Sequence, residues 1–283
     1  MQMAFDAVDG YGLVGRFYEH QGDVKPYPVL IAPATGITQG FYKKFIEYLT
    51  AQGYDVMSFD FRGIGASLHG RLKDSTASIS DWGVYDLPAA IDALLAKTGA
   101  KRLILIGHSA GAQLLGVAHN HHRVAKLISI AGSTGHVPQL SGRTRLLAPV
   151  MFDVIFRISS LTLGYGATKF IGMGENLPKQ VARQWREFCQ SGQYIKSAIG
   201  KSIRDDYHDQ ISCAMAAFYA SDDEIATEAN VRDLFALYPQ AMISYHRLEP
   251  AAFGLSDIGH MKLFRPSHRV LWDLVLDAMN DVQ

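Results

Sequence analysis

Short apolar runs alternate with stretches of helical periodicity over much of the chain. The apolar runs fall at residues 28–32, 55–60, 103–106 and 126–130. Runs of this length are typical of strands that are buried on both faces of a parallel sheet. Between them, residues 42–52 and 82–97 space their apolar side chains as amphipathic helices do. Ahead of this pattern, residues 5–8 and 13–18 flank an Asp-Gly turn signal and predict a β-hairpin. The alternation itself predicts βαβ units and a mostly parallel sheet flanked by helices.

One long insertion interrupts the alternation. Between residues 133 and 210 no clear buried strand is evident, and the clearest helix is expected at residues 178–190. Strand and helix patterns then return at residues 213–219, 227–237 and 242–248, and after Pro266. We therefore expect a core built from residues 1–132 and 211–283. Residues 133–210 are expected to form a helical cap, inserted between two strands of the sheet.

The pentapeptide Gly107-His108-Ser109-Ala110-Gly111 follows the apolar run 103–106 directly, and residues 113–118 are expected to form a helix after it. Small residues flanking a serine suit a sharp turn from strand to helix, in which the serine backbone is strained. Such a turn presents the Ser109 hydroxyl at the carboxyl edge of the sheet. It also places the Ala110 amide at a helix N-terminus, where a developing oxyanion is stabilised. The pattern predicts that Ser109 is a nucleophile; the alternative is a purely structural turn.

A serine nucleophile needs a base, and the base needs an orienting carboxylate. Two later loops can supply both groups: Asp222 and Asp223 follow the predicted strand 213–219, and His260 lies in a glycine-bearing loop after strand 242–248. The order Ser, Asp, His matches one known arrangement of this triad. Only one of the two adjacent aspartates can face His260, and Asp257 is a third alternative.

Other polar clusters are interpreted without special chemistry. The cluster 119–122 contains three histidines, but it lies at the far edge of the sheet without a nearby carboxylate, so we expect a solvated helix end and no metal site. Cys189 and Cys213 have no redox or zinc spacing and are expected to be small buried hydrophobes in a reducing cytoplasm. No cofactor is expected.

Composition and charge exclude several classes of partner. The chain has 283 residues, of which 48% are hydrophobic, which is enough for a sizeable core. Lysine plus arginine and aspartate plus glutamate number 27 each, so no overall charge favours nucleic acid or an anionic membrane as a partner. No apolar run is long enough to span a bilayer, and the N-terminus does not resemble a secretory signal. We expect a cytoplasmic protein; its oligomeric state does not follow from the sequence.

Several motifs in register resemble those of the α/β-hydrolase superfamily, in its branch of serine-aminopeptidase-like and monoglyceride-lipase-like hydrolases. They are VLIAPATGITQGFY, GYDVMSFDFRGIGAS, LILIGHSAGA, FYASDDEIAT and DIGHMKLF. The resemblance covers most of the chain outside residues 133–210. It implies an α/β-hydrolase fold with a catalytic triad.

The resemblance also implies two site residues. In the acid loop it places the triad aspartate on Asp223. In the loop after the third strand, the family's His-Gly pair aligns with Pro33-Ala34, and the residue whose amide completes the oxyanion hole aligns with Thr35. The missing histidine and glycine are a departure from the family pattern, and the alternative role for Thr35 is that of a loop-capping residue.

We therefore expect a serine hydrolase that cleaves an ester or related acyl bond of a small, apolar substrate. An acyltransferase or a peptidase with the same triad is an alternative, and so is a non-catalytic binding module. An aminopeptidase would need acidic residues near the site, for which Glu175, Glu187, Asp205 and Asp206 are available. Apolar residues such as Leu146, Met151 and Phe152 are expected either to line an acyl pocket or to pack the cap onto the core.

Overall fold

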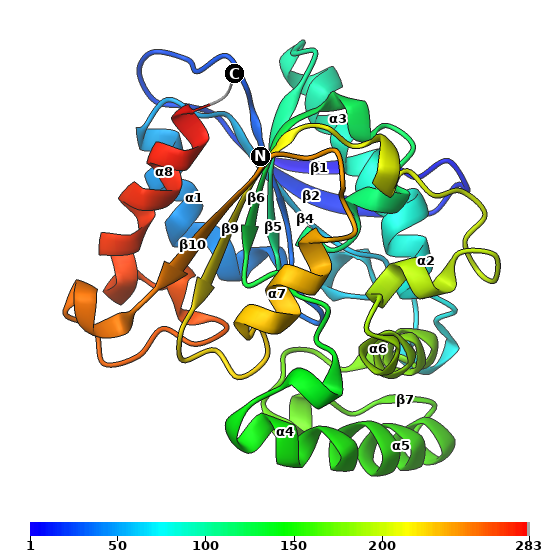
Figure 1. Ribbon diagram of the computed structural model, residues 1–283. Helices are drawn as coiled ribbons and strands as arrows, with labels where there is room; N and C mark the ends of the chain where they lie inside the picture. The colour runs from blue at the N-terminus through cyan, green and yellow to red at the C-terminus, as the bar shows by residue number, and fades with distance from the viewer. Residues whose placement is uncertain (282–283) are drawn as a thin grey trace.

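The computed structural model describes residues 1–281, which form a central sheet of eight strands between layers of helices (Figure 1). The strands are β1 (Gln2–Asp6), β2 (Gly12–Tyr18), β3 (Val29–Ala32), β4 (Val56–Asp60), β5 (Leu103–His108), β6 (Val124–Ile130), β9 (Ala214–Ala220) and β10 (Ile243–Leu248). Their order is β1-β2-β4-β3-β5-β6-β9-β10. Only β2 runs antiparallel to its neighbours; every other pair is parallel. The predicted fold class is confirmed.

Helices cover both faces of this sheet. The helices α1 (Lys43–Ala51) and α8 (Trp272–Asn280) pack on one face, and α3 (Leu87–Thr98) and α7 (Glu228–Phe235) pack on the other (Figure 1). Alternate residues of β3 enter the two cores, because successive side chains of a strand point to opposite faces. The central strands β3, β4, β5 and β6 are therefore buried along their whole length, and the carboxyl ends of the parallel strands meet at one edge of the sheet.

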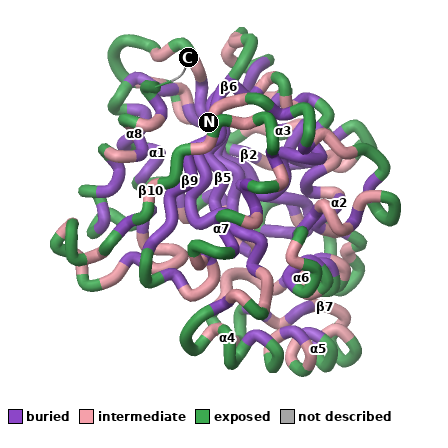
Figure 2. Tube along the Cα trace, viewed as in Figure 1, coloured by how far each residue is buried: buried purple, intermediate pink, exposed green. Residues whose placement is uncertain are grey.

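The long connection between β6 and β9 lies beyond this edge (Figure 1). It contains α4 (Gly142–Pro149), a wider helical turn (Val150–Ile155), α5 (Phe156–Thr162), the short strands β7 (Tyr165–Gly166) and β8 (Leu177–Pro178), and α6 (Lys179–Ser191). In Figure 2 the helix formed by α4 and α5 is the outermost layer, with exposed residues along its outer side. We call residues 131–213, between the end of β6 and the start of β9, the insertion.

Two local predictions were wrong. Residues 113–118 do not form a regular helix: only short 3-10 turns occur, at Ser109–Ala112 and Leu115–Val117. The Gly116 carbonyl accepts the Tyr207 N–H at 2.9 Å, and a side chain at Gly116 would lie 2.1 Å from the His208 ring, so tertiary contacts replace helical ones. The first strand begins earlier than expected and ends at Asp6, because the residue after it already belongs to the hairpin turn.

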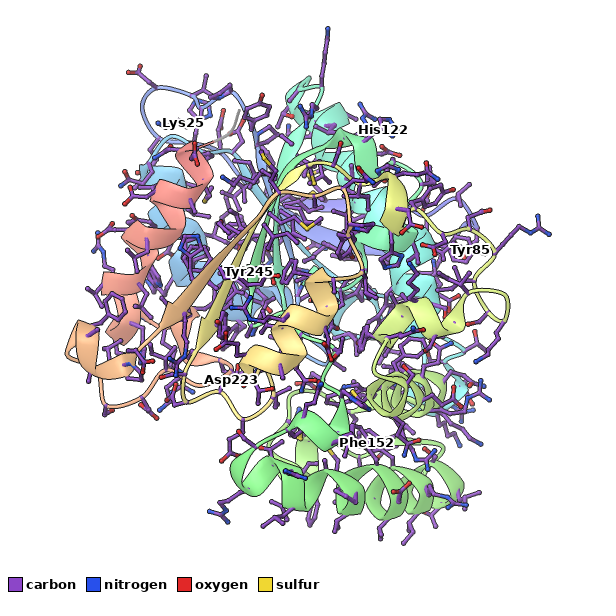
Figure 3. The ribbon with its side chains drawn as sticks, in the orientation of Figure 1. Lys25, Tyr85, His122, Phe152, Asp223 and Tyr245 are labelled. Atoms are coloured by element: carbon purple, nitrogen blue, oxygen red, sulfur yellow. The ribbon has the colours of Figure 1, made fainter. Side chains whose placement is uncertain are left out.

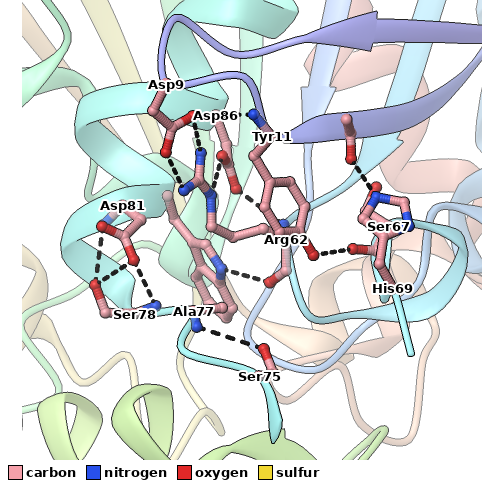
Figure 4. A network of polar contacts seen from close by, with 12 residues as sticks. Asp9, Tyr11, Arg62, Ser67, His69, Ser75, Ala77, Ser78, Asp81 and Asp86 are labelled. Carbon is pink, nitrogen blue, oxygen red and sulfur yellow. Dashed lines mark hydrogen bonds and ion pairs between the residues drawn. The ribbon is translucent and has the colours of Figure 1, made fainter. Parts of the chain in front are cut away.

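A buried ion pair joins the loop after β4 to the start of α3 (Figure 4). The Arg62 guanidinium donates to Asp86 at 2.6 Å and to Asp9 at 2.6 and 3.0 Å, and the Arg62 amide donates to Asp86 at 2.9 Å. The side chain of Asp86 is fully buried and that of Arg62 nearly so. The Trp82 indole N–H donates to the Arg62 carbonyl, which fixes the same loop against the helix. This network therefore holds the loop after β4 against the start of α3.

We expect Asp86→Ala to destabilise the fold by about 3 kcal/mol or more, because the substitution leaves the buried Arg62 guanidinium without its fully buried partner. Urea unfolding of the purified protein measures this change. Asp74→Ala is the matched control, since Asp74 pairs with Arg71 at the surface, and its cost should stay within about 1 kcal/mol. Equal effects of the two substitutions would contradict the account.

Candidate active site

Ser109 stands at the turn that follows β5, with its backbone in the left-handed region at φ 48°. Non-glycine residues rarely adopt this conformation, and where they do the strain is commonly associated with function. The turn fits only because its flanking residues are small: a side chain at Gly111 would lie 2.1 Å from the Ala32 carbonyl oxygen. The predicted strained turn is therefore present, and it leaves Ser109 half-buried at the carboxyl edge of the sheet.

Ser109 is hydrogen-bonded to His260, whose ring also contacts Asp223. The His260 Nε2 lies 2.9 Å from the Ser109 Oγ, and its Nδ1 lies 2.8 Å from the Asp223 Oδ2. A carboxylate only accepts, so Nδ1 carries the proton and Nε2 is free to accept the serine hydroxyl proton. The structure thus brings these three predicted residues together, from loops after β5, β9 and β10. Figure 3 shows Asp223 at the edge of the sheet that faces the insertion.

The Asp223 carboxylate is fully buried and well satisfied. Its Oδ1 accepts the amide protons of Ile225 and Ala226 at 2.8 and 2.9 Å. Burial alone raises the pKa of Asp223, but the His260 imidazole and the amide hydrogen bonds outweigh burial and lower the pKa below its usual value. The stability contributed by the ionised carboxylate is therefore present above its usual pKa and is lost as the pH falls through the lowered pKa.

The other two aspartates considered for this position lie elsewhere. Asp222 accepts the backbone N–H groups of Ile258 and Gly259 at 2.9 Å each, so it holds the loop that carries His260 without touching the ring. Asp257 is exposed and pairs with Lys262. Asp223 therefore contacts the imidazole ring of His260, whereas Asp222 contacts the backbone of the loop that carries His260.

A buried hydrogen-bond chain ties the site loops together, and it escaped the sequence analysis. The His108 Nε2 lies 3.0 Å from the backbone carbonyl oxygen of His260, which can only accept, so this nitrogen carries the proton. The His108 Nδ1 is then an acceptor for the Tyr42 hydroxyl at 2.9 Å. The same hydroxyl accepts the Ala34 N–H at 3.0 Å. Burial lowers the pKa of His108 to about 3, which keeps the ring neutral.

The sequence contains a signal for these hydrogen bonds, but the signal is ambiguous. Tyr42 fits the apolar face of the helix predicted at residues 42–52, and His108 lies inside the pentapeptide beside Ser109. Periodicity assigns an aromatic residue to the core but does not say what its hydroxyl contacts. Only the fold brings residues 34, 42, 108 and 260 within hydrogen-bonding distance.

The amides expected to bind an oxyanion flank the serine. The Ala110 N–H belongs to the first turn after β5, where amides have no intrahelical acceptor. Thr35 lies in the loop after β3, the strand that pairs with β5, and both Thr35 and Ser109 line one cavity. The Tyr42 hydrogen bond to the Ala34 amide fixes the residue directly before Thr35. Thr35 therefore lies at the same edge of the sheet as Ser109, and the two amides stay predicted oxyanion donors.

The cavity above Ser109 has a volume of about 510 Å³ and a mainly apolar wall. The insertion supplies most of that wall, including Met151, Phe152, Ile155, Trp185 and Cys189. Burial raises the pKa of the Cys189 thiol to about 12, so this residue is a neutral part of the wall. No aspartate or glutamate among residues 1–281 lines the cavity. Figure 3 shows Phe152 in the insertion, beyond the edge of the sheet that carries Asp223.

Neither a metal centre nor a membrane span is evident in the described part of the chain. No cluster of three histidine, cysteine, aspartate or glutamate side chains is arranged to hold an ion. Within the same residues, no helix has both the length and the apolar character needed to cross a bilayer. Cys189 and Cys213 are free thiols.

Comparisons with known proteins identify the family of this chain. The sequence profile of the family described as serine aminopeptidase, S33, matches residues 27–251. Human lipase member K is 27% identical over 159 residues, which cover 50% of this chain and 40% of the lipase. Lipase lipl-1 of Caenorhabditis elegans is 45% identical over 65 residues, covering 21% of this chain and 16% of that protein. The chain thus matches less than half the length of either lipase.

Solved structures share the whole fold. An esterase from Exiguobacterium antarcticum superposes with a TM-score of 0.62 at 14% identity, over 99% of this chain and 100% of that one. An esterase from Pyrococcus furiosus gives a TM-score of 0.62 at 15% identity, over 100% of this chain and 90% of that one. At these identities the likeness concerns the fold. Because the family profile spans most of the sequence, the chain belongs to the serine aminopeptidase S33 family, and it has the α/β-hydrolase fold.

Proposed function

We propose that this protein hydrolyses an ester bond in a small, mainly apolar acyl substrate, with Ser109 as nucleophile, His260 as base and Asp223 as orienting acid. One observation carries the proposal: hydrogen bonds run from the buried Asp223 through both ring nitrogens of His260 to Ser109, which opens into an apolar cavity. The apolar wall without carboxylates favours an ester over a peptide with a free amino group, because the amine would need a counter-charge there.

In the first step, the Ser109 oxygen attacks the ester carbonyl carbon while His260 Nε2 takes the hydroxyl proton. The tetrahedral intermediate collapses, the bond to the alcohol oxygen breaks, and the same proton passes from His260 to the leaving alcohol. A water molecule then attacks the acyl-enzyme, again giving its proton to His260, and the acid leaves as Ser109 is regenerated. Asp223 stays ionised and stabilises the imidazolium that forms in each step.

The oxyanion is proposed to bind between the amides of Ala110 and Thr35. Both amides are fixed before the substrate arrives, one by the turn after β5 and the other through the hydrogen bond that holds the neighbouring Ala34. Preorganised donors act without reorganisation cost, and one such donor is typically worth about 3–4 kcal/mol in the transition state. Pro33-Ala34 stand where the family has His-Gly, but the oxyanion donor proposed here is the backbone amide of Thr35, which does not depend on those side chains.

Within the insertion, residues 133–210 are proposed to act as a cap over the cavity. Its aromatic residues Phe152, Phe156 and Trp185 contact one another with ring centroids 5.7 to 5.8 Å apart, and Phe152 and Trp185 also line the cavity above Ser109. An acyl chain or aromatic ring that binds in this cavity is transferred from water to an apolar surface. The cavity volume of about 510 Å³ suits a ligand of small-molecule size.

Ser109→Ala should lower kcat for a p-nitrophenyl ester by roughly a million-fold, because the members of a triad act as a unit. The release of p-nitrophenol measures the rate. Ser244→Ala, at an exposed position on β10, is the control and should leave the rate unchanged. Full activity of the Ser109 variant would refute the assignment of the nucleophile.

The adjacent aspartates provide a matched pair of variants. Asp223→Asn should lower kcat by roughly 10⁴-fold, because an amide that donates to Nδ1 fixes the wrong imidazole tautomer. Asp222→Asn keeps one of the two oxygen acceptors for the loop backbone and leaves the imidazole contacts in place, so it should cost less than about tenfold. Steady-state kinetics on the same ester measure both. A larger loss in the Asp222 variant would reverse the assignment.

Tyr42→Phe should lower kcat by about ten- to a hundredfold with a smaller change in KM, because small displacements of reacting groups are costly. It should also destabilise the fold by about 1–3 kcal/mol, since the Ala34 amide and the His108 Nδ1 both lose their partner. The matched control is Tyr54→Phe, whose hydroxyl donates to Asn280 in α8. If both variants kept full kcat, the hydrogen-bond chain would have no positioning role.

A further inference from the structure

The outer side of the insertion carries a row of exposed aliphatic side chains. We call it the outer ridge; its members are Leu146, Leu147, Val150, Val154, Ile158 and Leu161. They recur three or four positions apart along the helix from α4 to α5, so they form one stripe. Leu146 and Leu161 are 76% and 81% exposed, although Leu146 was expected in the pocket or the core. Contiguous apolar surface of this kind marks an interaction site.

The opposite side of the same helix is already packed. Ala148, Phe152 and Phe156 are buried at intervals of four residues, and both phenylalanine rings contact Trp185 of α6. Figure 2 shows this division, with exposed residues on the outer side of α4 and α5 and buried residues facing α6. The helix cannot bury its outer ridge by rotating without exposing these aromatic residues. The ridge is therefore a fixed feature of the surface.

The charged residues of this helix that form no ion pair are basic. Arg143, Arg145 and Arg157 are exposed, and none of them forms an ion pair with any other residue of the range 1–281. The one acidic residue of the helix, Asp153, is paired with Arg186 of α6. If a second copy packed antiparallel on this helix, arginines near one end would face the arginine near the other end. Charge complementarity therefore favours an anionic surface over a second copy.

The outer ridge also adjoins the mouth of the cavity. Leu147 and Val150 belong to the ridge and line the cavity above Ser109 at the same time. Both are about half exposed, so the apolar wall of the cavity continues onto the apolar outer surface without a polar rim at these positions. An apolar group on the ridge can reach the cavity without crossing a charged barrier there.

We propose that the outer ridge docks on an anionic lipid surface, with its aliphatic side chains among the acyl chains and the three arginines at the headgroups. A basic amphipathic helix with aliphatic residues on one side binds membranes in this way. Docking places the cavity mouth against the lipid. This part rests on the proposed function: the ester that enters the cavity is then one dissolved in the lipid layer.

Flotation with vesicles tests docking apart from catalysis. The full chain should float with vesicles of phosphatidylcholine containing 30% phosphatidylglycerol, and far less with phosphatidylcholine alone. The triple substitution Leu146→Ser, Ile158→Ser and Leu161→Ser should lower the partition coefficient by about a hundredfold or more, since none of these residues lines the cavity. Arg143→Ala with Arg157→Ala should lower it roughly fivefold per residue and weaken its salt dependence.

The matched control is Val8→Ser with Met242→Ser, two residues that are 84% and 67% exposed elsewhere on the surface. This variant should float like the parent protein, and so should Ser109→Ala, which shows that docking does not require hydrolysis. Failure of the parent protein to float would overturn the proposal. So would a dimer in light scattering that the triple substitution converts to a monomer, since the ridge would then cover a second copy.

A paired assay connects docking with the substrate. The triple variant should hydrolyse a short, water-soluble p-nitrophenyl ester at the parent rate, which also shows that it is folded. It should hydrolyse a long-chain ester embedded in the anionic vesicles at least tenfold more slowly. Equal loss on both esters would contradict a docking role. Flotation without hydrolysis of either ester by the parent protein would refute the proposed function and leave docking intact.

Discussion

The close approach of backbone segments around Ser109 is the constraint on which the site depends. A side chain at Gly107 would lie 2.4 Å from the Ala112 backbone, and one at Gly111 would lie 2.1 Å from the Ala32 carbonyl oxygen. With hydrogen at both positions, the turn after β5 can pass directly beside β3. This contact brings the Ser109 hydroxyl and the Ala110 amide to the edge of the sheet. It also sets Thr35, which follows β3, next to them.

The rest of the site is held to that turn by polar contacts between distant loops. Parallel strands end at one edge, so the loops after β9 and β10 come near the turn, but nearness alone does not set hydrogen-bond geometry. Asp222 fixes the backbone before His260, and the His108 ring fixes the carbonyl of His260 itself. Tyr42 extends the same chain of contacts to Ala34. These hydrogen bonds therefore connect the loops after β3, β9 and β10 with the end of β5, next to the reacting groups.

Much of this arrangement could be predicted from the sequence because it depends on local chemistry. The sheet follows from short apolar runs, and Ser109 and His260 follow from turn residues at the ends of predicted strands. Asp223 and Thr35 came from family resemblance, since nothing local separates Asp223 from Asp222. The Tyr42–His108 contact and the missing helix at residues 113–118 depend on packing between distant segments, as with Gly116 against His208. Periodicity could not show that Leu146 faces outward, because one helix uses apolar residues on two sides.

The central claim is that Ser109 is the activated nucleophile of a hydrolase. The most direct measurement is reaction of the full chain with a fluorophosphonate, followed by peptide mass mapping of the adduct. The account predicts one phosphonylated residue, Ser109, and no adduct after His260→Ala under the same conditions. An unlabelled protein, or an adduct on any other residue of the chain, would contradict it.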